Sequence, residues 1–379
     1  MNRIKVFAWL LTGLLICSLG LSEGAFADTS GADQAAAAAD AGLAADAAGA
    51  TPTSGLTVAD AILRAELHSL DLRLSDLNIK SSGLNLDTAQ EDFDNWFSGS
   101  GDYDRVFVAL VESNIDYQKA KLNYDTALDQ LHIDTVQKYT NILLAQAKMA
   151  AADKSLEIAA YKKCEAQARY SLGLISQAEL NDALLSYESS HNAAEQARQA
   201  LEDSYAQFNE LIGLDSEERP QLTYEQPYQL LVIGNLEEEI EQRMNADPGL
   251  WSASQEVSKA ELRIDYLDED SVDDYQALQY TLAKSKINYQ QTQAQKRRSI
   301  TQLYDNVREL ERQIALHQHN LATAENNLDM VKFKQSLGMV NQGEVLAAEK
   351  NLLENQQNLN SLLYQHLLAK MAFETPWAA

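Results

Sequence analysis

Apolar residues recur along most of the chain at alternating spacings of four and three. The clearest series spans residues 180–212 and follows a heptad pattern, with His191 and Arg198 as its polar interruptions. A second series of the same kind spans residues 345–373. Heptad spacing places these side chains on one face of a helix. The pattern therefore predicts an all-α fold built from long helices that pack against one another as coiled coils.

The chain contains two copies of one half-protein. A shift of about 165 positions places the decapeptide SLGLISQAEL, residues 171–180, on SLGMVNQGEV, residues 336–345. The alignment continues upstream, where Tyr139 meets Tyr304. A shift of about 178 aligns the segments that precede, so that Val58 meets Leu236. We expect the function to use both copies.

Each copy is predicted to contain the same parts. A short helix, residues 58–80 in the first copy, precedes a connector and a long helix over residues 104–171. At 1.5 Å per residue the long helix spans about 100 Å. A glycine turn then leads into the heptad helix, which Gly213 ends. The short and heptad helices together match the long one in length. Each copy is therefore expected to be a long helix packed antiparallel against a two-piece partner, and the chain an elongated antiparallel bundle of two helical hairpins.

The second copy repeats this order, with a short helix at 236–264 that Pro248 breaks or kinks and a long helix at 274–336. The expected division of the chain follows from these elements and from its composition. It comprises a signal peptide at 1–27, an Ala- and Gly-rich flexible spacer at 28–55, helical repeat 1 at 56–213, a Pro-bearing linker at 214–234 and helical repeat 2 at 235–375.

The first residues predict export. Two basic residues precede a short apolar run, and Ala-Phe-Ala stands just before residue 28, which is the pattern of a cleaved secretory signal. Cys17 lies in this leader without the small residue that precedes a lipidated cysteine. The protein is therefore expected in the cell envelope, at the outer membrane or in the periplasm or cell surface.

Charge and chemistry exclude several classes of function. The formal net charge of −26 repels phosphate backbones, so no nucleic-acid partner is expected. His317 and His319 are two apart and point to different helix faces, so they cannot share a metal. Cys164 is expected to be a packed thiol, and the acidic connector at 268–274 a solvated turn, with calcium binding the less favoured alternative. No catalytic residues, metal site or cofactor are predicted, and the chain is not expected to be an enzyme.

The turn between the long and heptad helices carries a family resemblance. The segment ARYSLGLIS, residues 168–176, followed by Glu179 and Leu180, resembles the helix-turn-helix tip of the TolC-like outer-membrane efflux proteins. The resemblance covers residues 56–375, including the duplication, the helix lengths and the linker. The second tip departs from it, with Lys334 and Gln335 where Arg-Tyr is expected.

Membership would imply a homotrimer whose repeats close into a hollow helical cylinder. It would also imply that the tips dock a periplasmic adaptor (membrane-fusion) protein and, through it, an inner-membrane pump. Carried over by position, the implied partner-binding residues are Leu172, Gly173, Leu174, Ser176, Leu337, Gly338, Met339 and Asn341.

The connectors differ from the family, in which each carries two membrane strands. A spanning strand needs about 9–11 residues with alternating apolar positions. The first connector, 81–102, is barely long enough for two such strands and is acidic. The second, 265–274, is too short for two strands. The membrane β-strands are therefore predicted to be absent. An aromatic cluster near Gly99 is read either as a cap on the bundle end or as a membrane- or partner-binding patch around Trp96; it comprises Phe93, Trp96, Phe97, Tyr103 and Phe107.

Two classes of function remain open from the sequence. The first is a transport component, a TolC-like conduit of an export or efflux system that docks an adaptor and a pump. The alternative is a non-transporting structural or interaction bundle of the cell envelope.

Overall fold

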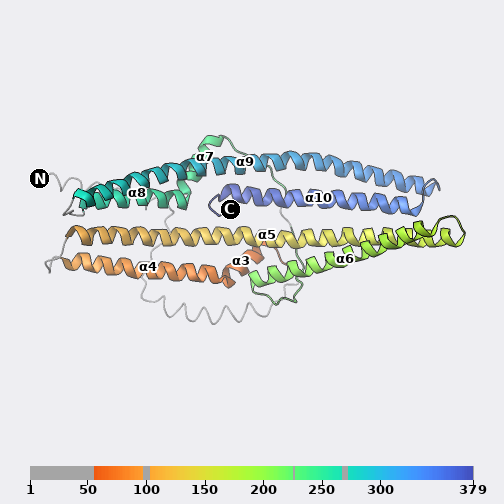
Figure 1. Cartoon of the computed structure of the whole chain (residues 1–379), viewed down its shortest axis with the longest axis horizontal. Helices are drawn as coiled ribbons and strands as arrows, with labels where there is room; N and C mark the ends of the chain where they lie inside the picture. Colours follow the sequence, from red (N-terminus) through yellow and green to blue (C-terminus); the bar gives the residue numbers. More distant parts are fainter. Residues whose placement is uncertain (1–54, 97–102, 225–226, 267–271, 379) are drawn as a thin grey trace. The chain divides into compact units, whose positions relative to one another are not determined.

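The computed structural model describes the chain from Gly55 onward as one compact unit of packed helices (Figure 1). The described residues are 55–96, 103–224, 227–266 and 272–378. The predicted signal peptide and nearly all of the predicted spacer lie outside them. Among the described residues the only β-type pairing is an isolated bridge between Leu56 and Leu222. The expectation of an all-α fold is confirmed for this part of the chain.

The helices of the described residues fall into two series of four. The first series is α3 (Val58–His68), α4 (Leu70–Asn95), α5 (Tyr103–Ser171) and α6 (Gln177–Ile212). The second series is α7 (Leu236–Ala246), α8 (Pro248–Tyr266), α9 (Val272–Ser336) and α10 (Gln342–Glu374).

In each series the long helix packs against two shorter ones in turn. In the first, α4 lies along the beginning of α5 and α6 along its end, with α3 between them (Figure 1). In the second, α8 and α10 pack in the same way against α9. The 69 residues of α5 correspond to about 100 Å of helix. The predicted antiparallel packing against the long helix is confirmed, but its partner has three pieces, because Ser69 divides the segment predicted as one short helix into α3 and α4.

A single extended residue separates the two short helices of each series. Ser69 separates α3 from α4, and its hydroxyl oxygen accepts a hydrogen bond from the Leu72 N–H at 3.2 Å. Asp247 stands at the aligned position between α7 and α8, and its Oδ1 accepts from the Leu250 N–H at 2.8 Å. Both side chains cap the helix that follows. The expected break at Pro248 is confirmed, because that proline is the first residue of α8.

The first short helix is longer than the sequence predicted. Residues 81–95, assigned to the connector, are helical and complete α4. Their half-buried positions continue the face packed on α5, where a Cβ atom built on Gly83 would lie 3.5 Å from the Tyr117 ring. The acidic residues of the segment lie on the exposed face. The segment was assigned to the connector because it is acidic, whereas its acidic residues form the outer side of an amphipathic helix. Residues 97–102 lie outside the described part.

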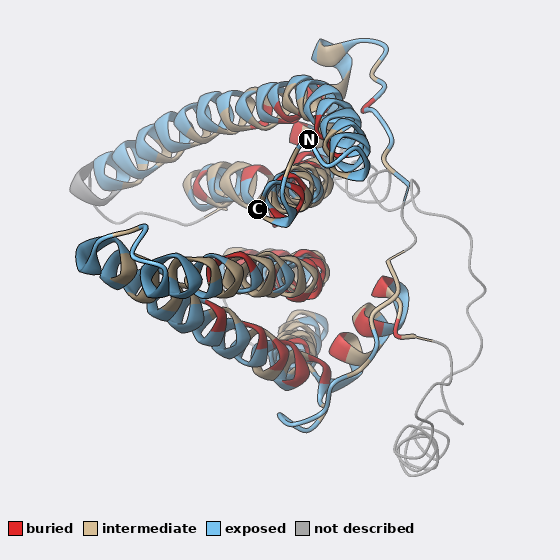
Figure 2. Cartoon of the chain, turned by 90° about the vertical axis from the view of Figure 1, so that its right-hand side faces the viewer, coloured by how far each residue is buried: buried red, intermediate tan, exposed pale blue. Residues whose placement is uncertain are grey.

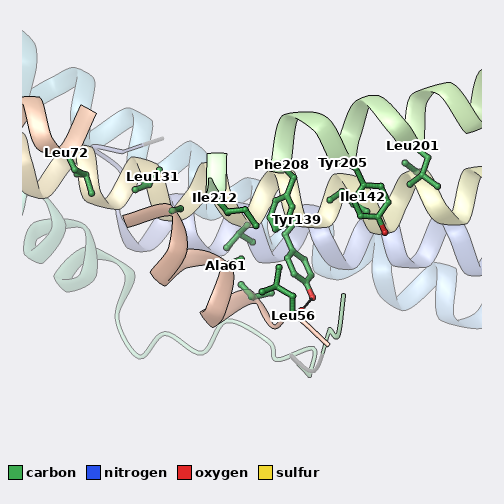
Figure 3. Packing of buried hydrophobic residues seen from close by; sticks show 14 residues of the cluster. Leu56, Ala61, Leu72, Leu131, Tyr139, Ile142, Leu201, Tyr205, Phe208 and Ile212 are labelled. Atoms are coloured by element: carbon green, nitrogen blue, oxygen red, sulfur yellow. Dashed lines mark hydrogen bonds between the residues drawn. The ribbon is translucent and has the colours of Figure 1, made fainter. Parts of the chain in front are cut away.

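The aligned aromatic residues of the two repeats form the centres of two cores. In the first, Tyr139 and Phe208 are fully buried, their rings meet edge to face at 5.8 Å, and the Tyr139 hydroxyl donates to the Leu56 carbonyl at 2.8 Å (Figure 3). In the second, Phe373 is fully buried and lies 6.0 Å from the Tyr304 ring. Each buried Phe stabilises its repeat by about 2–3 kcal/mol through burial alone.

Helix α5 joins the two repeats. It contacts α8 along its first part, where Lys259 pairs with Asp116 at 2.8 Å. It contacts α10 along its last part, where Lys154 pairs with Glu349 at 2.7 Å. The packing order is therefore α4, α5, α8, α9 in one half and α6, α5, α10, α9 in the other. Buried residues face inward between these neighbours (Figure 2). Helix α9 forms one flank of this unit, and α4 and α6 form the other.

Candidate functional site at the two hairpin turns

Two turns of the same construction connect each long helix to the heptad helix that follows it. Gly173 and Gly338 each have φ of +69°, a conformation that glycine adopts without steric cost. In the first turn the Gly173 N–H donates to the Tyr170 carbonyl, and the Leu174 N–H donates to the Arg169 carbonyl, both at 2.9 Å. In the second turn the two bonds are the same, ending on Gln335 and Lys334. This pair of bonds is the Schellman ending of a helix.

Side-chain caps fix the start of the next helix. Ser176 and Glu179 form a reciprocal capping box, in which the Ser176 N–H donates to the Glu179 carboxylate at 2.7 Å. Those hydrogen bonds lower the pKa of Glu179 below its usual value. In the second turn, Asn341 Oδ1 accepts from the Glu344 N–H at 3.0 Å. Both turns are thus defined on each side by hydrogen bonds within a few residues of sequence.

The apolar side chains at these turns point into solvent. The exposed fractions are 72% for Leu172, 69% for Leu174, 59% for Leu337 and 69% for Met339. The alternative considered from the sequence was that they pin each turn to its own hairpin. Their exposure does not support it. Their role in partner binding stays a prediction.

The two turns lie at the same end of the helical unit. Gly343, two residues after the cap of α10, is so close to α5 that a Cβ atom there would lie 3.0 Å from the Tyr161 ring. The tips are not equivalent in chemistry. In the first, Arg169 pairs with Glu165 at 2.6 Å. In the second, the Gln335 amide donates to the Gln342 side chain at 2.5 Å. The sequence difference between the tips is thus retained as a structural difference.

The aromatic cluster at the opposite end packs mainly on itself. Trp96 lies 4.9 Å from Tyr103, which stacks on Phe107 at 6.0 Å, and Phe107 contacts Tyr266 of the second repeat at 5.0 Å. Phe93 joins the same group at 5.8 Å from Tyr103. These contacts agree with a cap on the end of the bundle. Phe97 lies outside the described residues, and membrane association around Trp96 stays a prediction.

Two expectations about reactive groups have different outcomes. Cys164 is exposed, so the prediction of a packed thiol was wrong. Within the described part of the chain, no cluster of three or more His, Cys, Asp or Glu side chains is placed to hold a metal. The acidic connector falls largely on residues outside that part.

A second candidate surface, missed by the sequence reasoning, runs along the outer flank of α3 and α4. It is a row of leucines at heptad spacing whose exposed fractions lie between 59% and 73%. The row, here called the α4 leucine row, consists of Leu63, Leu67, Leu70, Leu74, Leu77 and Leu84. It is displaced by two residues from the face packed on α5, which corresponds to about 200° around the helix. A search for a second heptad series offset by two could have found it.

A similar row marks the outer flank of α9. Its members are at least half exposed, although Leu316 and Met330 are displaced by one residue from the heptad register of the other three; they are Tyr280, Ile287, Leu316, Met330 and Phe333. This set is here called the α9 row. The two flanks of the unit therefore both carry exposed apolar rows, and no helix of the described chain covers either.

The comparisons with known proteins identify the fold. No protein-family model matches the chain, and no curated protein is similar to it in sequence. Solved structures do match. The Campylobacter jejuni CmeC outer membrane channel is 12% identical over 95% of this chain and 93% of that one, with a TM-score of 0.64. The outer membrane protein VceC of Vibrio cholerae is 14% identical over 85% and 95%, with a TM-score of 0.58.

The Neisseria gonorrhoeae MtrE outer membrane channel, in its open state, is also similar, at 12% identity over 85% of this chain and 89% of that one and a TM-score of 0.60. The described helices thus have the fold of the TolC-like outer-membrane efflux channels. The resemblance read from the hairpin motif is confirmed at the level of the fold. Among the described residues, no helix combines the length and the apolar composition that a membrane span requires.

Proposed function

We propose that the chain is a component of an export or efflux system, in which several copies close into a helical conduit whose tips dock a periplasmic adaptor and its pump. The observation that carries this proposal is the pair of exposed apolar rows on opposite flanks. The fold shared with outer membrane channels supports the same direction. The proposal places the protein in the cell envelope.

The flanks favour a ring over a two-fold dimer. An isologous dimer uses the same patch on both partners, whereas the α4 leucine row and the α9 row are different surfaces on opposite sides. Joining one to the other gives a heterologous contact that repeats around an axis and closes when the rotation fits. Since α4 packs on α5 through its other face, it can contact a neighbouring copy without leaving its own repeat. Three copies, the number that the family resemblance implies, would close the ring.

We propose that the adaptor docks at the tips, the two turns at Gly173 and Gly338. Leu174 and Met339 expose apolar surface on rigid, capped turns at one end of the unit. Small apolar projections on a preorganised turn suit contact with the hairpin tip of another helical protein, because little conformational freedom is lost on binding.

Self-assembly is tested by sedimentation of the mature chain. We expect the wild type to form a closed oligomer and the double variant Leu74→Glu, Leu77→Glu to sediment as a monomer with unchanged helical circular dichroism. Gln90→Glu, which adds a charge at an exposed position of the same helix away from the row, is the matched control and should still assemble. A wild type that remains monomeric at high concentration would refute the conduit.

Docking is tested in cells that lack the chromosomal copy, by export of the system's cargo. Leu174→Glu with Met339→Glu should abolish export while the purified variant keeps its oligomer and its unfolding transition. Retained export in that variant contradicts tip docking. If the wild type assembles but its deletion leaves export unchanged, the chain is the non-transporting envelope bundle instead.

A further inference from the structure

A cavity of about 270 Å³ lies between the inter-repeat link and the last part of α10. The residues that matter for its chemistry are Tyr224 and Tyr228 from the link and Leu363, His366, Leu367 and Lys370 from α10. Three of these α10 side chains, at positions 363, 366 and 370, follow one another at spacings of three and four and thus share one helix face. The volume is at the small end of ligand sites.

The corresponding stretch of α6 in the first repeat is covered by the protein itself. The shift that aligns the repeats places Glu202 at the position of Leu367 and Tyr205 at the position of Lys370. Arg219 extends over this stretch, where it pairs with Glu202 and lies 5.1 Å above the Tyr205 ring. In the first repeat, Arg219 therefore occupies this place, and its positive charge matches the Glu202 carboxylate on α6.

In the second repeat the charge on the helix is reversed, and no side chain of the described residues occupies the corresponding place. Lys370 supplies an ammonium where the first repeat has a tyrosine, and Leu367 removes the carboxylate. Among the described residues, the nearest carboxylate to Lys370 is that of Glu374, at 4.0 Å and half exposed. By the same complementarity, the occupant of this cavity would carry a negative charge.

The remaining walls define the rest of the ligand. Leu363 and Leu367 are apolar, and Tyr228 meets the His366 ring edge to face at 5.0 Å. His366 is 3% exposed, and its Nε2 has no hydrogen-bond partner; the nearest carboxylate oxygen, Glu311 Oε1, is 3.5 Å away. Burial raises the pKa of both Tyr224 and Tyr228, so their phenols remain protonated donors. The cavity thus combines aromatic and aliphatic walls with a single cation at its edge.

We propose that this cavity binds a small amphipathic anion, a carboxylate on a body of one or two rings, with the carboxylate at Lys370 and the rings against Leu363, Leu367 and Tyr228. This inference does not depend on the conduit or on tip docking, because every side chain involved belongs to one chain.

The test is isothermal titration of the mature chain with 2-naphthoate, and with 2-naphthylmethanol as its uncharged counterpart. We expect the carboxylate to bind at least tenfold more tightly than the alcohol. Lys370→Gln should remove that difference, because it removes the cation alone. Lys350→Gln, which neutralises another lysine of α10, is the matched control and should bind as the wild type does.

A filling variant tests the place of binding. Leu367→Trp should abolish naphthoate binding; its unfolding transition shows whether it is folded, and Lys370→Glu, altered only at the rim, serves as the second variant if it is not. Lys370→Glu should weaken binding of naphthoate by more than tenfold. Equal affinity of folded Leu367→Trp and wild type, equal affinity of naphthoate for Lys370→Glu and wild type, or no naphthoate binding at millimolar concentration would each overturn the proposal.

Discussion

A buried ion pair in the second repeat replaces an apolar and hydroxyl pair in the first. Asp247 is 1% exposed, caps α8 through Oδ1, and places Oδ2 at 2.8 Å from the Lys296 ammonium. The repeat alignment places Ser69 at the position of Asp247 and Leu131 at the position of Lys296. Ser69 caps its helix as well, and Leu131 is buried. The first repeat therefore supplies the substitutions for a double-mutant cycle.

The three variants should differ sharply in stability. Lys296→Leu leaves a buried carboxylate without its cation, and removing one partner of a buried pair costs about 3–5 kcal/mol of unfolding free energy. Asp247→Ser keeps a capping oxygen, and Lys296, which is partly exposed, can turn to water, so we expect a cost of about 1 kcal/mol or less. The double variant should lie within about 1 kcal/mol of the wild type, because a well-packed neutral pair replaces an ion pair at little net cost.

The measurement is equilibrium unfolding in urea, followed by circular dichroism at one fixed protein concentration because assembly would add to stability. Lys286→Leu is the control. Lys286 lies on the same helix as Lys296 and pairs at the surface with Glu261 of α8, with both side chains about half exposed. Its replacement should change stability by less than about 1 kcal/mol. The reasoning fails if the double variant is as unstable as Lys296→Leu, or if Lys296→Leu costs no more than the surface control.

Two further predictions concern the second repeat. Trp377→Phe removes the indole N–H that donates to Asp129 Oδ2 at 2.7 Å and joins the C-terminal segment to α5; urea unfolding should show a loss of about 1.5–3 kcal/mol, and an unchanged midpoint would contradict it. Burial lowers the pKa of His366, with Lys370 adding to the effect and Glu311 opposing it. The unfolded chain then takes up a proton before the native one, so this contribution to stability is complete above the ordinary histidine pKa of about 6.5 and is lost as the pH falls below it. His366→Leu should show a weaker loss of stability between about pH 7 and pH 5 than the wild type, and parallel profiles would contradict the assignment.

The turns and long helices could be predicted because their signals are local. Gly173, Gly213 and Gly338 were expected at positions that favour positive φ, and all three have φ near +70°. The hairpin lengths followed from the spacing of apolar residues alone. The end of α4 was missed for the opposite reason: composition was weighed above spacing, although the apolar positions around Gly83 continue the heptad face.

The contacts between the repeats could not be read from spacing. A heptad series shows that a helix face is packed, but the partner helix depends on which faces meet in three dimensions. The pairing of Lys154 with Glu349 joins residues far apart in sequence, and nothing local indicates it. The exposure of Cys164 could not be predicted from spacing either, because both sides of a long helix that lies between two repeats carry polar and apolar residues.

The polar residues in the core of the second repeat show how the two copies diverged. Asp247 and Lys296 appear together where the first copy has neither charge. Glu311 and His366 also appear together, where the first copy has glutamine and leucine. An unpaired buried charge costs several kcal/mol, so a polar replacement in the core persists only with a partner. Lys370 differs from these core residues, because it is partly exposed, lies 4.0 Å from the Glu374 carboxylate and faces a cavity at the place where the first copy has a stacked arginine. An anionic ligand in this cavity would give Lys370 a closer partner than the described residues supply.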